Sequence, residues 1–196
     1  MTDQSQVALH RKIILAFAIL FTANVVLDQI TKIHAERTFL KYAHKEDLKI
    51  YQGSSMPIFN LGSIEKRQPG FGFGFTYVRN QGAAWGLLNN LDDKYRIPFF
   101  YIVTIFAIVM IGFFFKSTPP KARLARFALV LVLSGAIGNF LDRLRLGYVI
   151  DWIDVRWNIF GWYYDFPKFN IADSCISIGI AFLIIDMLFL EKRRTQ

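Results

Sequence analysis

The sequence predicts a mainly α-helical membrane protein with four transmembrane helices and a small extracytoplasmic subdomain that is rich in β-strand. Hydrophobic residues make up 54% of its 196 residues and aromatic residues 16%, which is too apolar for an ordinary soluble domain. Four apolar segments approach the length of about 20 residues that a bilayer span requires. They cover residues 13–31, 97–115, 124–146 and 171–190. We expect one integral membrane domain over residues 1–196, with outer loops at 32–96 and 147–170.

Three of the four predicted spans carry charged residues. Only residues 97–115 run for 19 positions without one, and the acidic residues of the other spans are Asp28, Asp142, Asp173 and Asp186. A charged side chain costs about 2.5–3.5 kcal/mol at the centre of an inserted helix, so these acids should face the bundle interior. The first span begins with basic residues, as a signal peptide does. Because Asn24 and Asp28 stand where a cleavage site would need small residues, we expect a retained anchor.

The net charge of +8 lies largely in short clusters that flank the apolar segments, at residues 11–12, 116–126 and 192–194. Lys and Arg in short loops favour the cytoplasmic side of a membrane. Four spans therefore place these clusters and both termini in the cytoplasm. The first outer loop is also basic, but at about 65 residues it is too long for this rule to apply strongly. This distribution favours membrane orientation over binding to nucleic acid.

Polar residues recur at helical spacing in three places. The pairs are Asn24 with Asp28, Asn139 with Asp142, and Asn170 with Asp173. Residues three or four apart share one face of a helix, so three polar faces are expected to meet. Polar residues also hold membrane bundles together through interhelical hydrogen bonds. For Asp28 and Asp142 this structural role is at least as well supported as a catalytic one, because Arg143 and Arg145 lie close enough in sequence to neutralise Asp142.

Asp151 and Asp173 favour a catalytic function. They are 22 residues apart in the chain, and Gly147 is a predicted helix stop, so consecutive helices should bring both acids to the outer membrane face. Acids at a membrane edge without an adjacent basic residue are poor structural glue. Two close carboxylates share a single proton. One can take a proton from water while the other protonates or polarises a carbonyl group, as in aspartic proteases.

Other chemistries have less support in the sequence. The single cysteine, Cys175, excludes an internal disulfide, and the scattered histidines His10, His34 and His44 lack metal-ligand spacing. We therefore expect no metal and no cofactor. Ser174 and Cys175 have no histidine near them in sequence for a nucleophilic triad. Two non-enzymatic functions stay open: a proton-coupled carrier, whose acids would be expected near the midplane, and a structural subunit, which would tolerate neutral isosteres at both acids.

Five ordered motifs together resemble one known family. They are residues 27–32 (LDQITK), 79–86 (RNQGAAWG), 135–143 (GAIGNFLDR), 149–153 (VIDWI) and 169–174 (FNIADS). In this order they resemble the bacterial lipoprotein signal peptidases, which are type II signal peptidases and four-span aspartic proteases. Two features depart from the family pattern. The first outer loop has extra residues around 38–70, and Ser134 stands where a second glycine is usual.

The resemblance implies a function and a set of site residues. Asp151 and Asp173 would be the catalytic pair, with Asp28 and Asp142 as supporting residues. The substrate and inhibitor pocket would be lined by Asn80, Gly82, Asn139, Arg143 and Asn170. The implied reaction removes the signal peptide from a diacylglyceryl-modified prolipoprotein by cutting before the lipidated cysteine. It implies the bacterial inner membrane with the active site at its outer face, and as partners the lipidated precursor, membrane lipid and a cyclic-peptide inhibitor of the globomycin type.

The outer loops are rich in aromatic residues. Residues 70–77 alternate glycine or threonine with aromatic residues, which puts Phe71, Phe73, Phe75 and Tyr77 on one face of a strand. That face could meet lipid or a lipidated substrate, or it could pack on a helix of the same subdomain, and the sequence supports both equally. The resemblance implies a small β-sheet here. In the second outer loop, an interfacial aromatic belt accounts for Trp152, Trp157, Trp162, Tyr163 and Tyr164.

Two further segments have mainly structural interpretations. Residues 82–86 (GAAWG) predict a close approach of the backbone together with an interfacial tryptophan. A GxxxG helix-pairing motif is the minor alternative, because the run lies outside an apolar span. Asp186 lies near the cytoplasmic end of the last span, where we expect it to pair with the basic C-terminal tail.

Overall fold

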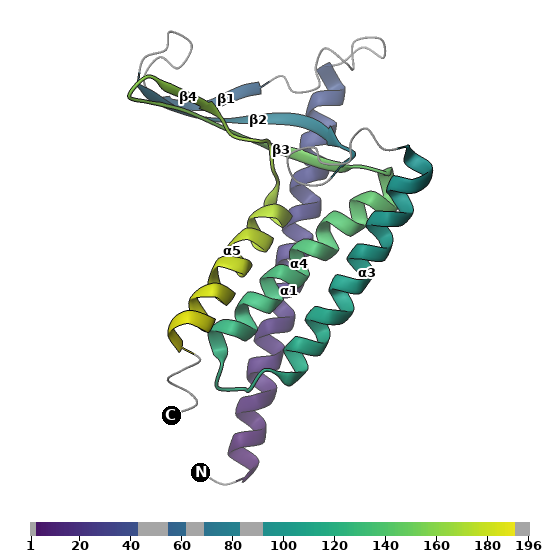
Figure 1. Cartoon of the computed structure of the whole chain (residues 1–196), viewed down its shortest axis with the longest axis vertical. Coiled ribbons are helices and arrows are strands. Elements are labelled where there is room, and N and C mark those ends of the chain that lie inside the picture. The colour runs from purple at the N-terminus through teal and green to yellow at the C-terminus, as the bar shows by residue number, and fades with distance from the viewer. Residues whose placement is uncertain (1–2, 43–54, 62–68, 83–91, 191–196) are drawn as a thin grey trace. The chain divides into compact units, whose positions relative to one another are not determined.

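The computed structural model describes residues 3–42, 55–61, 69–82 and 92–190 (Figure 1). Its helices are α1 (Asp3–Tyr42), α3 (Asp93–Ser117), α4 (Arg123–Leu146) and α5 (Ile171–Ile185), which continues into a π-helical turn, η3 (Asp186–Leu190). Its strands are β1 (Ser55–Leu61), β2 (Gly70–Asn80), β3 (Val149–Ile159) and β4 (Trp162–Asp165). The chain forms two compact units. Residues 1–28, 97–141 and 171–196 make the helical unit, and residues 29–96 and 142–170 make the sheet unit.

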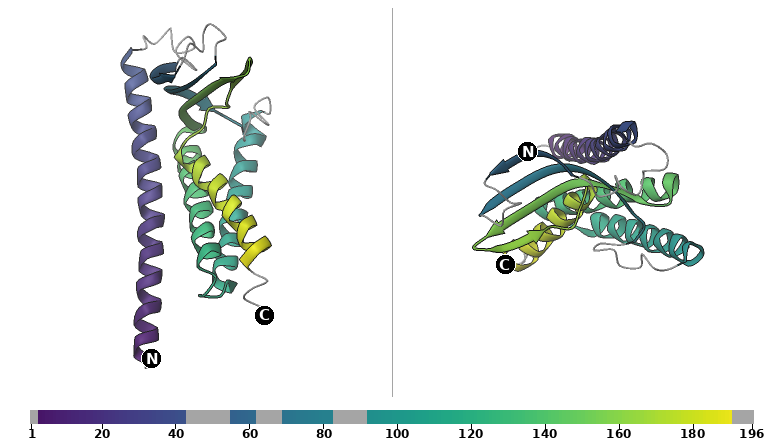
Figure 2. Two further views of the ribbon diagram at one scale, coloured as in Figure 1. Left: turned by 90° about the vertical axis from the view of Figure 1, so that its left-hand side faces the viewer. Right: turned by 90° about the horizontal axis from the view of Figure 1, so that it is seen from above.

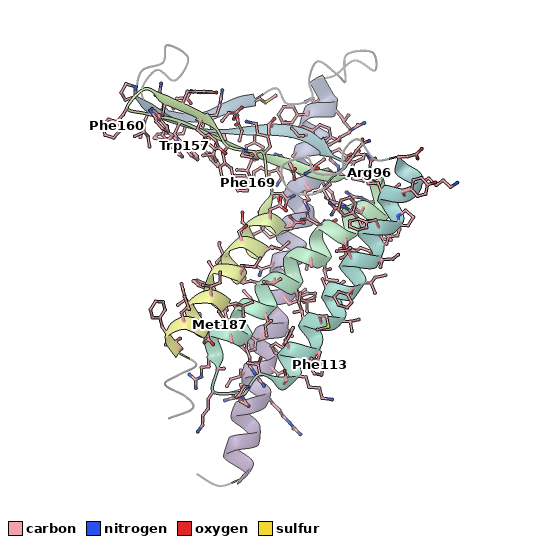
Figure 3. The ribbon with its side chains drawn as sticks, in the orientation of Figure 1. Arg96, Phe113, Trp157, Phe160, Phe169 and Met187 are labelled. Atoms are coloured by element: carbon pink, nitrogen blue, oxygen red, sulfur yellow. The ribbon has the colours of Figure 1, made fainter. Side chains whose placement is uncertain are left out.

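The prediction of four membrane spans is confirmed. In the described part of the chain, four helical stretches are long and apolar enough to cross a membrane: Arg11–Lys41, Lys94–Ser117, Arg123–Leu146 and Ile171–Leu190. On α3 most apolar side chains remain exposed, including Ile102, Phe106 and Val109. Phe113, labelled in Figure 3, is also exposed. An apolar surface of this kind suits contact with lipid.

Small and polar residues bring the helices of the helical unit together. Gly135 on α4 lies so close to α5 that a β-carbon there would sit 2.3 Å from the carbonyl oxygen of Ala172. Only glycine allows this approach. The neighbouring Ser134, which stands where the resemblance predicts a glycine, is buried and donates a hydrogen bond of 2.9 Å to the carbonyl of Leu131. Its hydroxyl also accepts a bond of 3.3 Å from Asn24 of α1, so the serine links two helices.

The sheet unit contains one antiparallel sheet with the strand order β1-β2-β3-β4 (Figure 2). Strands β2 and β3 pair from Gly70 opposite Asn158 to Asn80 opposite Val149. A register shift between Phe75 and Val78 interrupts this ladder, and Thr76 and Tyr77 are both buried. The strict alternation predicted for residues 71–77 therefore ends at Phe75, because a bulge changes the order in which side chains face the two sides of a sheet.

Helix α1 is longer than the sequence suggested. The sequence predicts that residues 32–42 belong to the first outer loop, yet the helix continues through them to Tyr42. The physical reason is tertiary packing. Phe39 is almost fully buried and stacks on Tyr77 with ring centroids 6.2 Å apart, and together with Ile150 these residues form the core of the sheet unit. The hydrophobic contact stabilises a helical turn beyond the apolar span.

The end of α4 lies where the sequence predicted it. The helix stops at Leu146, and Gly147 has a φ of 78°, a conformation that favours glycine. The Gly147 amide donates to the carbonyl of Arg143 over 3.0 Å, which closes the last turn as a glycine cap does. Strand β3 begins two residues later, so this cap sets the start of the strand that carries Asp151.

The β3–β4 hairpin ends in an exposed aromatic tip. Ile159 pairs with Trp162 across a two-residue turn, in which Phe160 and Gly161 have φ values of 52° and 85°. Positive φ at both positions is the geometry of a type I′ hairpin turn. Phe160 is 94% exposed, and Figure 3 shows it at the far end of the hairpin. A shallow apolar hollow of about 530 Å³ is lined by Trp157, Ile159, Phe160, Trp162, Tyr163 and Tyr164.

Candidate active site

Asp151 is a buried carboxylate on β3 that two asparagine side chains hold in place. The side-chain amide of Asn80 donates to Oδ2 over 2.9 Å, and that of Asn170 donates to Oδ1 over 2.8 Å. Strand pairing supplies the first partner, because the end of β2 runs beside the start of β3 with Val78 opposite Asp151. Burying a carboxylate is costly unless it is hydrogen-bonded, and here each oxygen has an amide donor.

The loop after β2 is held by a chain of contacts that starts at Asn80. Its side-chain oxygen accepts a bond of 3.0 Å from the Gly82 amide, as in an Asx turn. The Gly82 carbonyl in turn accepts a bond of 2.7 Å from the guanidinium of Arg143 at the end of α4. Three residues expected to line the substrate pocket are therefore connected to one another. The remainder of the predicted close approach, residues 83–86, lies outside the described residues.

The segment before α5 pairs with β3 and brings Asn170 to Asp151. Phe169 forms an antiparallel bridge with Ile153, and its carbonyl accepts bonds from the amides of Trp152 and Ile153 at 3.0 and 2.8 Å. The side-chain amide of Asn170 also lies 3.3 Å from the carbonyl oxygen of Ile150. This pairing makes Asn170 completely buried and orients its amide toward the carboxylate.

In the helical unit, Asp173 lies in the first turn of α5 and meets Asn139 of α4. The Asn139 side-chain amide donates to Asp173 Oδ1 over 2.8 Å. A negative charge in the first turn of a helix is stabilised by the helix dipole. Asp28 of α1 supports the same turn, because its Oδ1 accepts a bond of 2.9 Å from the Ala172 amide. Polar residues of α1 and α4 therefore meet the first turn of α5 in this unit. The sequence also predicts that Asn170 shares a helical face with Asp173, but α5 begins at Ile171 and the Asn170 amide bonds to Asp151 instead.

Asp142 has a different partner from the one predicted. The sequence suggested that Arg143 and Arg145 neutralise it, but Arg143 bonds to the Gly82 carbonyl. The cation beside Asp142 is Lys32, with Nζ 3.1 Å from Oδ2 and both side chains fully buried. Gln29 donates to Oδ1 over 3.0 Å and the Ile150 amide to Oδ2 over 3.2 Å. For Arg143 the physical reason is that consecutive residues on a helix point in different directions.

Lys32 and Gln29 were not selected as site residues from the sequence. A usable signal existed, since Lys32 follows Asp28 by four residues at the end of an apolar segment. A lysine in that position needs a buried anion or an exit to water. Asp142 was the available anion on another helix. Of the two roles that the sequence left open for Asp142, its contacts support the structural one.

Two aromatic residues of β2, Phe75 and Tyr77, pack against other aromatic side chains of the sheet unit. Phe75 stacks on Trp152 at 4.7 Å and lies edge-on to His34 of α1 at 6.4 Å, while Tyr77 stacks on Phe39 of the same helix. For these residues the structure supports packing on a helix rather than contact with lipid. It also separates Trp152, which is buried, from the exposed aromatic residues of the hairpin. Trp152 is therefore not part of an interfacial belt.

Tyr77 also belongs to a polar cluster beside Asn80. Its hydroxyl accepts a bond of 3.0 Å from Arg79 Nε and lies 3.4 Å from the hydroxyl of Tyr148. Burial raises the pKa of the Tyr77 phenol well above its ordinary value. The hydrogen bond with Tyr148 adds to this rise in pKa, and the Arg79 guanidinium partly opposes it. The neutral phenol is thus fixed beside the strand end that presents Asn80.

The remaining expectations concern a metal site, the extended first outer loop and the basic C-terminal tail. Among the described residues, no three His, Cys, Asp or Glu side chains gather in a way that could hold a metal ion. Much of the extended loop predicted around 38–70 lies outside the described residues, at 43–54 and 62–68. The basic tail expected to pair with Asp186 also lies outside them, while Asp186 itself is buried in η3.

Comparison with known proteins identifies the family. Residues 20–189 match the family model of signal peptidase II. The lipoprotein signal peptidase of Geobacter metallireducens is 41% identical over 180 residues, which cover 92% of this chain and 94% of that protein. The lipoprotein signal peptidase of Staphylococcus aureus (strain JH9) is 36% identical over 181 residues, which cover 92% and 93%.

Solved structures agree with this assignment. Two structures of bacterial membrane enzymes are each 34% identical to this chain and cover 89% of it. Their TM-scores are 0.67 and 0.65, over 88% and 94% of the respective chains. The match of the family model, the identity of the relatives and the shared fold show that this chain belongs to the signal peptidase II family of membrane-embedded aspartic peptidases.

Proposed function

We propose that Asp151 and Asp173 are the catalytic pair with which this peptidase removes signal peptides from prolipoproteins. The observation that carries the proposal is the kind of partner each acid has. Asn80 and Asn170 donate to Asp151, and Asn139 donates to Asp173. An amide orients a carboxylate without cancelling its charge. Asp142, by contrast, is paired with the ammonium group of Lys32.

Chain connectivity also supports this pair. Asn170 contacts Asp151, and Asp173 follows Asn170 by three residues. Three trans peptide steps of about 3.8 Å limit the distance between the Cα atoms of residues 170 and 173 to about 11 Å. The contact of Asn170 with one acid therefore limits how far the other can lie from it.

The chemistry is hydrolysis of a peptide bond by an acid–base pair. The ionised carboxylate takes a proton from a water molecule while the oxygen of that water attacks the scissile carbonyl carbon. At the same time the other, protonated carboxyl group donates its proton to the carbonyl oxygen. The resulting tetrahedral diol then collapses. The C–N bond breaks, the amine leaves with the proton first taken from water, and the second carboxyl group recovers its own. No covalent enzyme intermediate is needed.

The substrate is a diacylglyceryl-modified prolipoprotein, cut on the N-terminal side of its lipidated cysteine. The residues proposed to line its pocket are Asn80, Gly82, Asn139, Arg143 and Asn170. Their polar groups hold the two acids or the loop beside them, so the same set would orient both the acids and a bound peptide. A cyclic peptide of the globomycin type would occupy this pocket and inhibit cleavage.

The protein is proposed to lie in the bacterial inner membrane with both termini in the cytoplasm and the active site at the outer face. The short basic clusters at residues 11–12, 116–126 and 192–194 support this orientation. Reporters fused at the N-terminus, near Thr118 and after Gln196 should read cytoplasmic. An external reading at Thr118 would reject the orientation.

The decisive experiment is cleavage of a lipidated precursor by purified Asp151→Asn and Asp173→Asn variants. Asparagine keeps the volume of aspartate and can still form hydrogen bonds, but it cannot exchange a proton at working pH. Each variant should fold and bind the precursor without turnover, and the double variant should be little worse than either. Asp165→Asn, at an exposed acid, is the matched control. Robust cleavage by Asp151→Asn beside a folded but inactive Asp142→Asn protein would move the pair to Asp142 and Asp173.

A further inference from the structure

A second group of charged residues lies on β3, beyond the residues assigned to catalysis. Its centre is Asp154, whose side chain is only 1% exposed. The ammonium group of Lys168 contacts Asp154 Oδ1, and Arg156 Nε lies 3.3 Å from Oδ2. Lys168 also contacts Asp165, an acid that is 49% exposed. A buried carboxylate therefore depends on a lysine that comes from a different segment of the chain.

Lys168 lies directly before the residues that pair with β3 and contact Asp151. Lys168 immediately precedes Phe169, which bridges to Ile153, and Asn170, which donates to Asp151. On the other side, the amide of Phe166 donates to the Val155 carbonyl over 2.9 Å. Residues 166–170 thus run antiparallel to β3, and the ion pair of Lys168 with Asp154 links these two segments.

The charge on Lys168 is stable in this environment. Burial alone would lower the pKa of its ammonium group, but the hydrogen bonds to Asp154 and Asp165 outweigh burial and raise the pKa above its ordinary value. Lys168 therefore stays protonated throughout the neutral pH range, and its attraction to Asp154 is present whenever the enzyme works.

We propose that Lys168 is a positioning residue, whose ion pair with Asp154 holds residues 168–170 in register on β3. This register sets the amide of Asn170 against Asp151. The inference rests on the proposed catalytic pair. It adds that the position of the Asn170 amide against Asp151 depends on a charge contact that neither of these two residues makes.

The expected effect follows from the sensitivity of catalysis to geometry. A displacement of about 1 Å can cost about 100-fold in rate when it misaligns reacting groups. Without the lysine charge, the backbone bonds of Phe169 remain, so the segment is loosened rather than detached. We therefore expect Lys168→Met to lower kcat by about 10- to 100-fold. KM for the lipidated precursor should stay within about twofold, because Asn170 is the single proposed pocket residue within the loosened segment.

Three variants separate positioning from a merely structural role. Lys168→Arg keeps the positive charge and should retain most of kcat. Asp165→Asn removes only the exposed partner and should leave kcat within about threefold, since exposed pairs contribute little. Lys168→Met should also speed amide hydrogen exchange at Phe169 and Asn170 in the folded protein. If Lys168→Met does not purify folded, Lys168→Gln, which can still hydrogen-bond to Asp154, provides the same comparison with Lys168→Arg.

The outcomes distinguish this inference from the proposed function. Full kcat in the charge-removing variant, or an equal loss in Lys168→Arg, would overturn the positioning role. A lower unfolding temperature with unchanged kcat would do the same, because it would show a contribution to stability alone. If these results occur while Asp151→Asn and Asp173→Asn are inactive, only the positioning inference fails. If the two aspartate variants cleave the precursor, the proposed catalytic pair itself is rejected.

Discussion

Replacing Lys32 by methionine should strongly destabilise the sheet unit. Methionine keeps most of the length and apolar stem of lysine but removes the charge that faces Asp142 at 3.1 Å. Both side chains are fully buried, so water cannot replace the lost partner. Removing one member of a buried ion pair costs about 3–5 kcal/mol. Native proteins have only about 5–15 kcal/mol of stability, so the loss should be evident in the free energy of unfolding.

The remaining contacts of Asp142 set where the loss should fall within that range. Gln29 and the Ile150 amide still donate to the carboxylate over 3.0 and 3.2 Å. Hydrogen bonds to a charged group contribute about 1.5–3 kcal/mol each. These two donors offset part of the desolvation cost, so we expect a loss near 3 kcal/mol rather than 5. The double variant Lys32→Met/Asp142→Asn, which buries no charge, should regain most of it.

The assay is a double-mutant cycle on the free energy of unfolding in detergent micelles, followed by tryptophan fluorescence. The wild type, the two single variants and the double variant give the coupling energy between Lys32 and Asp142. Arg143→Met serves as the control, because sequence proximity suggested Arg143 as the partner of Asp142. A double variant no more stable than Lys32→Met would refute the reasoning, as would coupling of Asp142 to Arg143 in place of Lys32.

Three further predictions use other parts of the molecule. Gly135→Ala should lower the free energy of unfolding by about 1–3 kcal/mol, because the added carbon would lie 2.3 Å from the Ala172 carbonyl oxygen. Gly112→Ala, where the added carbon would meet no neighbouring segment within 4 Å, should be neutral or slightly stabilising. Thermal unfolding of both variants tests this. The raised pKa of Tyr77 means that the unfolded chain ionises first, so stability should fall as pH rises above about 10, and this fall should be smaller in Tyr77→Phe. Cleavage should survive strong chelators, because carboxylates would activate the water; loss of activity that a divalent ion restores would contradict this.

The sequence was sufficient for those features that depend on neighbouring residues. Apolar runs of about 20 residues predicted the four spans, and the helices with the required length and hydropathy contain all of them. Gly147 predicted the end of α4 through its tolerance of positive φ, which the structure contains. Because acids in or at the edge of a membrane are costly, the sequence also indicated that Asp28, Asp142, Asp151 and Asp173 have specific roles. Each of these judgements uses hydropathy, helical spacing or backbone preference, all of which are local.

The partners of the acids required the tertiary structure. From the sequence alone, Arg143 was the natural counterion for its neighbour Asp142, whereas the folded chain provides Lys32. The asparagine spacing indicated polar contacts among the helices, but not that Asn139 would bond to Asp173 or that Asn80 would bond to Asp151. It also placed Asn170 on the helix of Asp173, whereas α5 begins only at Ile171. The helical extension at residues 32–42 likewise depends on contacts of Phe39 that lie far away in sequence.

The physical reason is that hydropathy and helix spacing are encoded within a few turns, whereas a buried charge takes its partner from whichever segment the fold brings beside it. Gln29 and Asp142 are 113 residues apart, and Asp28 and Ala172 are 144 apart. At such separations every polar side chain of suitable length is a candidate partner. The direction of each side chain on its helix or strand then selects among them, and only packing of the complete chain determines that direction.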